Sequence, residues 1–338
     1  MTKIRILNKE NIEAVFTIKM ALQAVEQAYL EKATGRGSVW PMVFHEFDPG
    51  RADLDIKSGD LSLEGIFGAK IVSWFGGNPD RHLPALFGTS IIFDLKTGEP
   101  KALLNAGPIT DLRTGAAGAI GIKYLARRDA KKLVILGCGE LAAYLIAATL
   151  IVMPDLEKVV LINPHHPEKA IEKQNEIVSK ADFLLAQSGE KRRTEITAAI
   201  DIEEAVETAD IIITATASYE AMIKRDWVRQ GTHFSCMGSD MSGKQEIDEE
   251  ILKDAKVFGD DQLQCLSVGE CEKAYKDGLI SGITGEIGEI ISGMISGRTA
   301  DSDVTIFDST GIALQDLASA AIILKNAERM SIGCEVDL

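Results

Sequence analysis

Residues 132–142 read KLVILGCGELA, and this stretch decides the expected fold. Apolar residues at 132–136 predict a buried strand, and an apolar helix is expected to follow the turn up to about residue 151. The turn between them has the pattern G-x-G-x-x-A, which is typical of a dinucleotide-binding site when it joins a strand to a helix. A turn in some other doubly wound fold is the alternative interpretation.

Each small residue of this turn has a physical role. Gly137 permits the tight turn, Gly139 lets main-chain N–H groups approach a pyrophosphate, and Ala142 lets the helix pack closely on the sheet. The N-terminus of the helix then favours the anionic phosphates. We therefore predict that these cofactor-binding residues hold NAD(P)(H): Gly137, Gly139, Glu140, Leu141 and Ala142.

Strands and helices alternate along the chain that follows. Strands are expected at 158–162, 210–214, 232–237 and 256–258, and helices at 170–181 and 202–208. This alternation predicts an α/β fold, a Rossmann doubly wound parallel sheet covered on both faces. The strand at 210–214 ends in Thr214 and is followed by Ala215 and Thr216. These small residues leave room for a cofactor, or they form only a tight turn.

The end of the strand at 158–162 bears on which nicotinamide cofactor binds. NAD enzymes usually carry Asp or Glu there, where it binds the ribose 2′-hydroxyl. No residue of 162–166 is acidic, and Asn163 is followed by His165, His166 and Lys169. These residues favour NADP, whose 2′-phosphate needs basic or neutral neighbours. The alternative is a solvated histidine loop in which Asn163 serves either cofactor.

The chain on either side of this region has a different character. A helix is expected at 11–34, short β-rich runs with turn signals at 38–103, and a helix rich in small residues at 110–125. A final amphipathic helix at 316–330 is expected to return to the first domain. The 338 residues thus predict two domains. One is an α+β substrate-binding and dimerisation domain with an antiparallel sheet, residues 1–125 with 311–338, and the other is the Rossmann domain, residues 126–310.

Composition excludes several classes of partner. With 36 basic and 51 acidic residues the net charge is −15, which disfavours nucleic acids and anionic membranes. The longest apolar run, near 141–153, is too short to cross a bilayer, and no targeting segment is visible. Five scattered cysteines form no CxxC pair, and no histidines have metal-ligand spacing, so we expect a cytoplasmic protein without a metal site.

Seven motifs in the same order make the chain resemble the ornithine cyclodeaminase/mu-crystallin family. They are GAK at 68–70, TGEP at 97–100, TDLRTGAA at 110–117, GCGELA at 137–142, GSDMSGKQE at 238–246, GRT at 297–299 and FDSTGIALQD at 307–316. The resemblance implies a homodimer that acts on small amino acids or imino acids. The common reaction transfers hydride between an amine carbon and a nicotinamide through an imine.

The resemblance also implies roles for single residues. Lys70 and Arg113 match the cations at the substrate carboxylate, with Lys70 also counted as catalytic; a surface lysine and an Arg113–Asp111 ion pair are the alternatives. Asp240 matches the general base or electrostatic partner of the substrate nitrogen, unless it is only a turn or capping residue.

On the cofactor side the resemblance implies Thr114 and Asp308. The alternative for the segment after Asp308 is that Ser309 or Thr310 caps the final helix. Near Asp240, we expect Lys244 and Glu246 only to complete the loop.

One segment departs from the family pattern. Many members carry a basic residue at the position of Val43, and apolar residues and a methionine are common where this chain reads DLDIKSG at 53–59. Asp55 matches a position that is acidic in ornithine cyclodeaminases, whereas Lys57 is unusual there. In a strand these two side chains share a face. We therefore predict that Lys57 replaces the missing cation and that Asp55 orients it or binds a substrate amine. An exposed edge strand with a weak ion pair is the alternative.

Three functions remain open from the sequence. The first is an NAD(P)-dependent amino-acid dehydrogenase or ketimine reductase, with net turnover of the cofactor. The second is an ornithine or lysine cyclodeaminase, in which NAD is recycled internally and ammonia leaves. The third is a non-enzymatic crystallin-like protein that binds NADP(H) and a small ligand, against which the retained Lys70, Arg113 and Asp240 argue.

Overall fold

The structure is a computed structural model that describes residues 2–338 and divides into two compact units. Unit 1 comprises the chain up to Arg113 and Ile312–Leu338, and unit 2 comprises Thr114–Gly311. The first division falls inside helix α3 (Ala106–Leu125), twelve residues before the expected boundary at 125. The second half of α3 packs within unit 2, since a Cβ on Gly115 would meet Tyr144 and one on Gly121 would meet Phe307.

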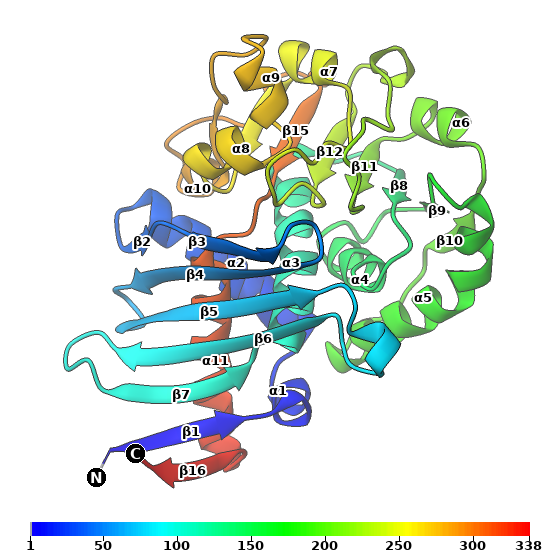
Figure 1. The fold of residues 1–338 in the computed structure, drawn as a ribbon. Helices are drawn as coiled ribbons and strands as arrows, with labels where there is room; N and C mark the ends of the chain where they lie inside the picture. Colours follow the sequence, from blue (N-terminus) through cyan, green and yellow to red (C-terminus); the bar gives the residue numbers. More distant parts are fainter. Residues whose placement is uncertain (1) are drawn as a thin grey trace. The chain divides into compact units, whose positions relative to one another are not determined.

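An eight-stranded sheet forms the body of unit 1 (Figure 1). Its path is β16-β1-β7-β6-β5-β4-β2, with β3 also paired to β4, and only β1 and β7 run parallel. The antiparallel sheet expected at 38–103 is confirmed, and strands from both ends of the chain extend it. The strands are β1 (Lys3–Leu7), β2 (Gly37–Val39), β3 (Val43–Asp48), β4 (Ala52–Leu61), β5 (Ile66–Phe75), β6 (Leu86–Asp94), β7 (Pro100–Asn105) and β16 (Cys334–Asp337).

Helices α1 (Lys9–Val15), α2 (Ile18–Ala33) and α11 (Ala313–Met330) complete unit 1. The single helix expected at 11–34 is wrong, because Phe16 is extended and Thr17 begins a new helix by accepting a hydrogen bond from the Met20 N–H. Helix α11 contacts α2, β4 and β5. Gly68 in β5 makes this contact possible, since a Cβ there would lie 2.3 Å from the Ile91 carbonyl oxygen and 3.1 Å from Leu317.

A second eight-stranded sheet forms unit 2, and every strand in it is parallel. Its order is β10-β9-β8-β11-β12-β15-β13-β14, which is the doubly wound arrangement predicted from the sequence. The late strand β15 inserts between β12 and β13. The strands are β8 (Lys132–Leu136), β9 (Lys158–Ile162), β10 (Glu195–Ala198), β11 (Ile211–Thr214), β12 (His233–Cys236), β13 (Lys256–Gly259), β14 (Gly285–Glu286) and β15 (Thr305–Asp308).

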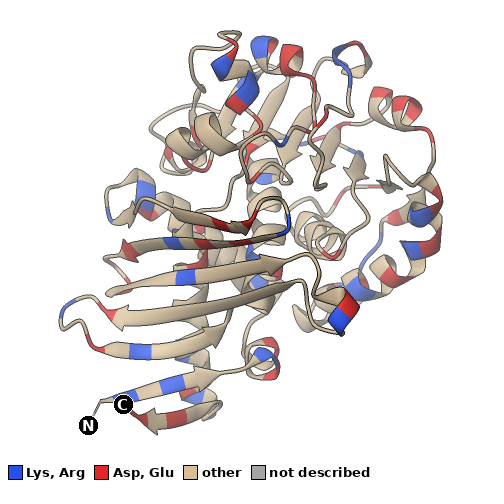
Figure 2. Cartoon of the chain, in the orientation of Figure 1, with Lys and Arg blue, Asp and Glu red and all other residues tan. Residues whose placement is uncertain are grey.

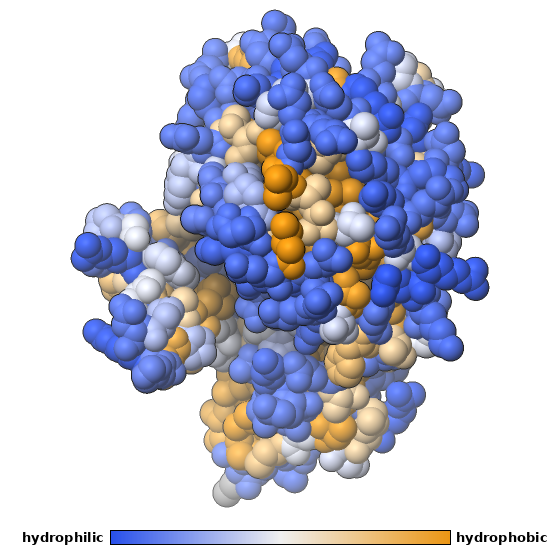
Figure 3. All heavy atoms as spheres, turned by 90° about the vertical axis from the view of Figure 1, so that its right-hand side faces the viewer, coloured by the Kyte–Doolittle hydropathy of each residue, from blue (hydrophilic) through white to orange (hydrophobic). Residues whose placement is uncertain are grey.

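The helices of unit 2 cover this sheet, and several of them carry charged residues (Figure 2). They are α4 (Ala142–Val152), α5 (Pro167–Gln187), α6 (Ile202–Glu207), α7 (Glu249–Asp254), α8 (Gln262–Val268), α9 (Glu272–Lys276) and α10 (Ile287–Ile291). Val134, Ile212 and Phe234 on the central strands are fully buried, as a parallel sheet covered on both faces requires. Hydrophilic residues cover most of the face seen in Figure 3. Within residues 2–338 no helix is long and apolar enough to cross a membrane.

Candidate active site

Lys70 lies in β5 and is 4% exposed, so the alternative of a surface lysine is wrong. Its Nζ is 3.1 Å from a carboxylate oxygen of Asp316 and 3.5 Å from the Thr110 hydroxyl oxygen. Burial, together with the charges of Arg113 and Lys57, lowers the pKa of Lys70 to about 8, although the charge of Asp316 raises it. At neutral pH the ammonium is therefore largely charged and held in a dry environment.

Arg113 is brought to the same carboxylate. Its Nε lies 3.7 Å from Asp316, and its NH1 donates to Gln315 at 3.0 Å. Gln315 in turn donates to the Tyr29 hydroxyl at 2.6 Å, which fixes the amide. Two cations around one carboxylate leave a net charge of about +1, which suits one substrate carboxylate. Asp316 is a functional residue that the sequence reasoning missed, although it is the last residue of the 307–316 motif.

The strand register brings Lys57 to the same face of the sheet. Lys57 in β4 pairs directly with Lys70, and Asp55 precedes it by two residues on that face. Val43 pairs with Ile56, which points to the other face. A cation at position 43 would therefore lie away from Lys70. The valine at this position does not remove a carboxylate-binding cation from the face that carries Lys70, contrary to the expectation. The role of Lys57 and Asp55 in substrate binding stays a prediction.

In unit 2 the glycine turn joins β8 to α4. Gly137 has φ +116°, and a Cβ there would lie 2.3 Å from the Ala215 carbonyl oxygen. A Cβ on Gly139 would meet no atom within 4 Å, so the space beside its backbone is open. Leu141 at the start of α4 makes no side-chain cap, and although the Ala142 N–H donates to the Gly139 carbonyl at 3.2 Å, the N-terminal end of the helix still favours an anion. The residues present therefore fit a dinucleotide pyrophosphate.

The other residues of this turn behave as expected of such a site. Ala142 is buried and begins α4, whereas Glu140 is exposed. At the end of β9, the Asn163 side-chain oxygen accepts a hydrogen bond from the His166 N–H at 3.0 Å. This bond shapes the loop that leads into α5, and it occupies the carbonyl side of the Asn163 amide.

The ends of β11 and β12 are held by Glu246, which sequence reasoning left as a loop residue. Glu246 is fully buried and accepts hydrogen bonds from the Thr214 hydroxyl at 2.7 Å, from the Thr216 N–H at 2.7 Å and from the Gly238 N–H at 2.9 Å. The Thr214 hydroxyl therefore points to Glu246. Ala215 contributes its carbonyl beside Gly137.

Asp240 lies in the loop after β12, and its side chain is 50% exposed. Its carboxylate accepts from the Lys244 ammonium at 2.6 Å, so Lys244 does more than complete the loop. A half-exposed carboxylate beside a lysine remains available to a substrate nitrogen. Its catalytic role stays a prediction.

Asp308 is fully buried, and Thr114 is buried in α3. The Asp308 carboxylate accepts from the N–H groups of Glu270 and Cys271, both at 3.2 Å, so it binds protein main chain. Burial raises the pKa of Asp308 to about 7.

The capping alternative for the segment after Asp308 is wrong. Helix α11 begins after Ile312 without a side-chain cap. Ser309 and Thr310 instead donate their hydroxyl groups to Asp260, at 3.1 Å and 2.9 Å.

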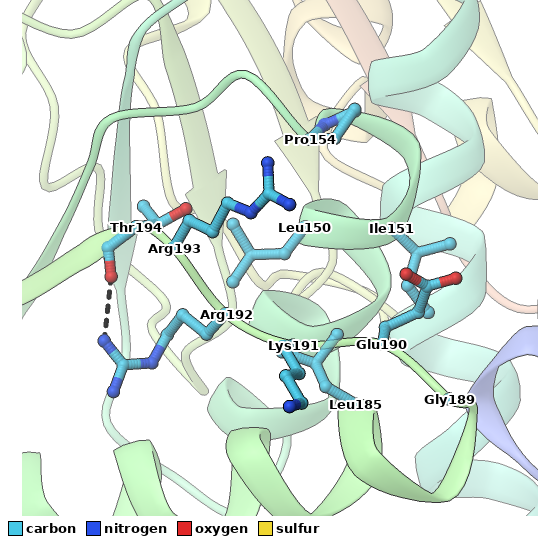
Figure 4. Close-up of a pocket in the computed structure, with 10 residues that line it drawn as sticks. All are labelled: Leu150, Ile151, Pro154, Leu185, Gly189, Glu190, Lys191, Arg192, Arg193 and Thr194. Carbon is cyan, nitrogen blue, oxygen red and sulfur yellow. Dashed lines mark hydrogen bonds between the residues drawn. The ribbon is translucent and has the colours of Figure 1, made fainter.

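A pocket of about 390 Å³ lies elsewhere in unit 2 (Figure 4). Leu150, Ile151 and Leu185 form its apolar part, and the 189–194 segment supplies its basic residues. Arg192 there is held by Asp182 at 2.7 Å and by the Thr194 carbonyl at 2.8 Å. The pocket adjoins the residues that precede β9 and β10, at the edge of the sheet opposite the glycine turn, so it does not belong to the dinucleotide site.

Comparison with known proteins agrees with this geometry. A model of the ornithine cyclodeaminase/mu-crystallin family matches residues 3–331. The chain is 35% identical to alanine dehydrogenase of Archaeoglobus fulgidus, covering 98% of this chain and 97% of that one, and 31% identical to iminosuccinate reductase of Paracoccus denitrificans, covering 98% and 99%. A solved archaeal alanine dehydrogenase dimer with bound NAD superimposes with a TM-score of 0.88, 36% identity and 99% of both chains covered.

Proposed function

Because the chain belongs to the ornithine cyclodeaminase/mu-crystallin family, we propose that it is an NAD(P)-dependent oxidoreductase acting on the C–N bond of an amino acid or imino acid. Unit 1 would bind the substrate and form the dimer, and unit 2 would bind the dinucleotide. The relatives named above are a dehydrogenase and a reductase of this chemical class. An amino-acid dehydrogenase and a ketimine reductase are the two forms that this activity takes.

The observation that carries the proposal is the buried pair Lys70 and Arg113 around Asp316. A net positive charge away from water is costly unless an anion completes it. The α-carboxylate of an amino acid or imino acid supplies one charge and two oxygens, which match an ammonium and a guanidinium fork. Dinucleotide-dependent enzymes act on many kinds of substrate, and the buried Lys70 and Arg113 favour one that carries a carboxylate.

The residues of the proposed site have separate roles in the reaction. A bound nicotinamide supplies or accepts the hydride at the substrate carbon. Lys70 and Arg113 hold the carboxylate and thereby fix the carbon that reacts. Asp240 stabilises the positive charge that develops on the imine nitrogen and exchanges a proton with nitrogen or water. The Lys244 ammonium pairs with this carboxylate at 2.6 Å and holds it in place.

For the cofactor, the neutral and basic residues after β9 favour NADP over NAD. The residues at 162–166 offer no carboxylate to a ribose 2′-hydroxyl, and Lys169 lies in the first turn of α5. The related alanine dehydrogenase structure holds NAD, so both cofactors have to be compared directly. A lower KM for NADPH than for NADH would support the preference.

A homodimer is the expected assembly. Exposed apolar residues cluster on the outer face of the unit 1 sheet, the face opposite Lys70. The archaeal relative is a dimer. Apolar surface of this kind marks an interaction site.

A cyclodeaminase is the second candidate function, and Asp55 is the observation that favours it. Asp55 shares the sheet face of Lys57 and Lys70, where a carboxylate could bind the second amine of ornithine or lysine. A crystallin-like binding protein is a third, weaker candidate, because binding alone needs no Asp240.

The experiment that separates these functions measures reduced nicotinamide and ammonia in parallel. Purified protein is given alanine, aspartate, ornithine or lysine with NAD or NADP, and pyruvate plus ammonia or a cyclic ketimine with NADH or NADPH. Steady change in absorbance indicates a dehydrogenase or reductase. Ammonia release without net absorbance change indicates a cyclodeaminase. Binding of a dinucleotide without either signal on any substrate would contradict enzymatic function.

A further inference from the structure

Three buried carboxylates follow one another along the carboxyl edge of the unit 2 sheet. Asp308 ends β15, Glu270 lies between α8 and α9, and Glu246 lies in the loop after β12. These residues are at most 1% exposed. The reaction proposed above uses none of them as a substrate ligand, so their burial needs another explanation.

Each carboxylate in this series accepts a hydrogen bond from the main chain of the next member. Asp308 accepts from the Glu270 N–H at 3.2 Å, and Glu270 accepts from the Glu246 N–H at 2.9 Å. Glu246 then accepts from the N–H groups of Thr216 at 2.7 Å and Gly238 at 2.9 Å. The series therefore connects β15 to the first residues after β11 and β12.

The middle member also holds the loop that carries Asp240. Glu270 accepts from the Ser239 hydroxyl at 2.5 Å and from the Ile247 N–H at 2.8 Å. These two residues lie at opposite ends of the 239–247 loop. One carboxylate thus closes the loop, while Asp240 between its ends stays half exposed.

Two glycines, Gly238 and Gly269, leave room for the carboxylates of Glu246 and Asp308. A Cβ on Gly238 would lie 2.5 Å from a carboxylate oxygen of Glu246, and a Cβ on Gly269 would lie 2.5 Å from one of Asp308. The Cβ on Gly238 would also lie 2.2 Å from the Thr216 carbonyl oxygen, and the one on Gly269 would lie 2.8 Å from the Cα of Cys265. A larger residue at either position would therefore disturb both a carboxylate of the series and the backbone beside it, and neither glycine is required by a positive φ.

The hydrogen bonds found for the series across residues 2–338 come from N–H and hydroxyl groups, with no Lys, Arg or His among the donors. Burial raises the pKa of Glu270 to about 8 and that of Asp308 to about 7, and it also raises the pKa of Glu246. The charged or titratable groups that face them are Cys236 of β12, Cys265 of α8, Cys271 before α9 and Asp260 after β13. All of these are acids, so none of them supplies a positive charge that would offset the burial of the three carboxylates.

We propose that Glu246, Glu270 and Asp308 are positioning residues for the dinucleotide site, which hold the ends of β11 and β12 and the Asp240 loop through main-chain N–H groups. These three carboxylates fix the main chain at the ends of β11 and β12, against which the cofactor would bind. They contact neither the cofactor nor the substrate themselves. The inference rests on the proposed dinucleotide-dependent function.

The first test compares Glu246→Gln with Asp210→Asn. The glutamine keeps the shape of Glu246 but turns an NH₂ group toward N–H donors. Asp210 serves as the control, because it too accepts from main-chain N–H groups, of Lys131 at 2.8 Å and Lys132 at 2.9 Å, at the opposite edge of the same sheet, although it also pairs with Arg127 and Arg229. We expect Glu246→Gln to weaken the Kd for NADPH and NADH, measured by nicotinamide fluorescence, about tenfold, and Asp210→Asn to leave it unchanged. Equal Kd values in wild type and Glu246→Gln would overturn the proposal.

A second readout needs no cofactor. Amide hydrogen exchange of the unliganded protein should be faster at Thr216 and Gly238 in Glu246→Gln, and faster at Ile247 in Glu270→Gln, with other strand amides unchanged. Wild-type exchange at these amides in both variants would overturn the proposal. If wild type binds neither NADH nor NADPH, the proposed function fails, whereas the exchange data still decide whether the series positions the backbone.

The pH dependence of wild type covers the case in which Glu246→Gln does not fold. Glu270 is protonated below its pKa of about 8 and ionised above it, where it repels Glu246. The affinity for NADPH should therefore fall as the pH rises through about 8, and Glu270→Gln, which cannot ionise, should lose this dependence. An affinity that does not change between pH 7 and about 9 in wild type would contradict the proposal.

Discussion

At the scale of single residues, Asp316 sets the charge of the proposed substrate site, since it is the counterion of both Lys70 and Arg113. Asp316→Asn removes the carboxylate that raises the pKa of Lys70, so this pKa should fall below about 8. A lysine is charged below its pKa, and the variant should therefore lose substrate affinity at a lower pH than wild type does. The pH profile of KM between about 6 and 9 measures this shift.

Asp94→Asn is the matched control for this prediction. Asp94 pairs with Lys101 at 3.0 Å in the same unit, but on the exposed surface. Its removal should leave the KM profile as in wild type. A profile that is identical in Asp316→Asn and wild type would show that Lys70 does not bind the substrate carboxylate.

Lys57 offers a second prediction at this scale. Since it pairs directly with Lys70, its ammonium adds positive charge to the face that holds the substrate carboxylate. Lys57→Met keeps the length of the side chain but removes the charge, and we expect KM for the true substrate to rise about tenfold with a smaller change in kcat. Lys101→Met serves as the control, because Lys101 is exposed on β7. An unchanged KM in Lys57→Met would leave Lys57 as part of a surface ion pair.

The sequence singled out Lys70 and Arg113 as candidate site residues, but it did not indicate their partner Asp316. Lys70 and Arg113 stand in apolar or small-residue segments, where a charged residue is unusual and therefore draws attention in the sequence. Asp316 lies 246 residues away from Lys70, and only the return of α11 to the sheet brings the two together. Glu246 and Glu270 could not be foreseen for the same reason, because buried carboxylates that bind main-chain N–H groups leave no local pattern.

At the scale of elements, continuous apolar runs were predicted well and short or mixed segments were not. β8, β9 and β11 are apolar on both faces, which signals a buried parallel strand. β10 and β15 have four residues each and mix polar with apolar types, so they resemble loops until the neighbouring strands are known. The break between α1 and α2 was missed because Phe16 continues the apolar pattern of a single helix. The helical hydrogen bonds of α1 nevertheless end at Phe16, and Thr17 caps the start of α2.

The β8–turn–α4 element allows a prediction that separates folding from binding. Gly137→Ala places a Cβ 2.3 Å from the Ala215 carbonyl at φ +116°, so it should lower Tm and abolish NADPH binding. Gly139→Ala meets no atom of the protein within 4 Å, so it should keep the wild-type Tm and yet weaken binding at least about tenfold, because the methyl group occupies the space of the pyrophosphate. Thermal melting and fluorescence titration of both variants provide the measurements. Full NADPH affinity in Gly139→Ala would contradict the placement of the pyrophosphate.

At the scale of the whole molecule, an acidic surface and one apolar sheet face point to different partners. The net charge of −15 disfavours binding to polyanions. By contrast, the outer face of the unit 1 sheet exposes Val43, Phe47, Ile71, Phe75 and Phe87, each between 37% and 56% accessible. Strand register places Val43 with Ile71 on this face, and Phe47 stacks on Phe75 with ring centroids 5.9 Å apart.

An exposed apolar face beside the edge strand β3 would aggregate unless another surface covers it, and a second copy offers a face of the same shape. We therefore expect a mass of about twice 36.5 kDa in light scattering, and we expect Phe47→Glu and Phe87→Glu to shift it toward one chain, because each places a charge in the apolar interface. Leu263→Glu is the control, since Leu263 is 79% exposed but lies on α8 of unit 2. A monomeric wild type, or a control that dissociates as readily as the two phenylalanine variants, would place the dimer contact elsewhere or exclude it.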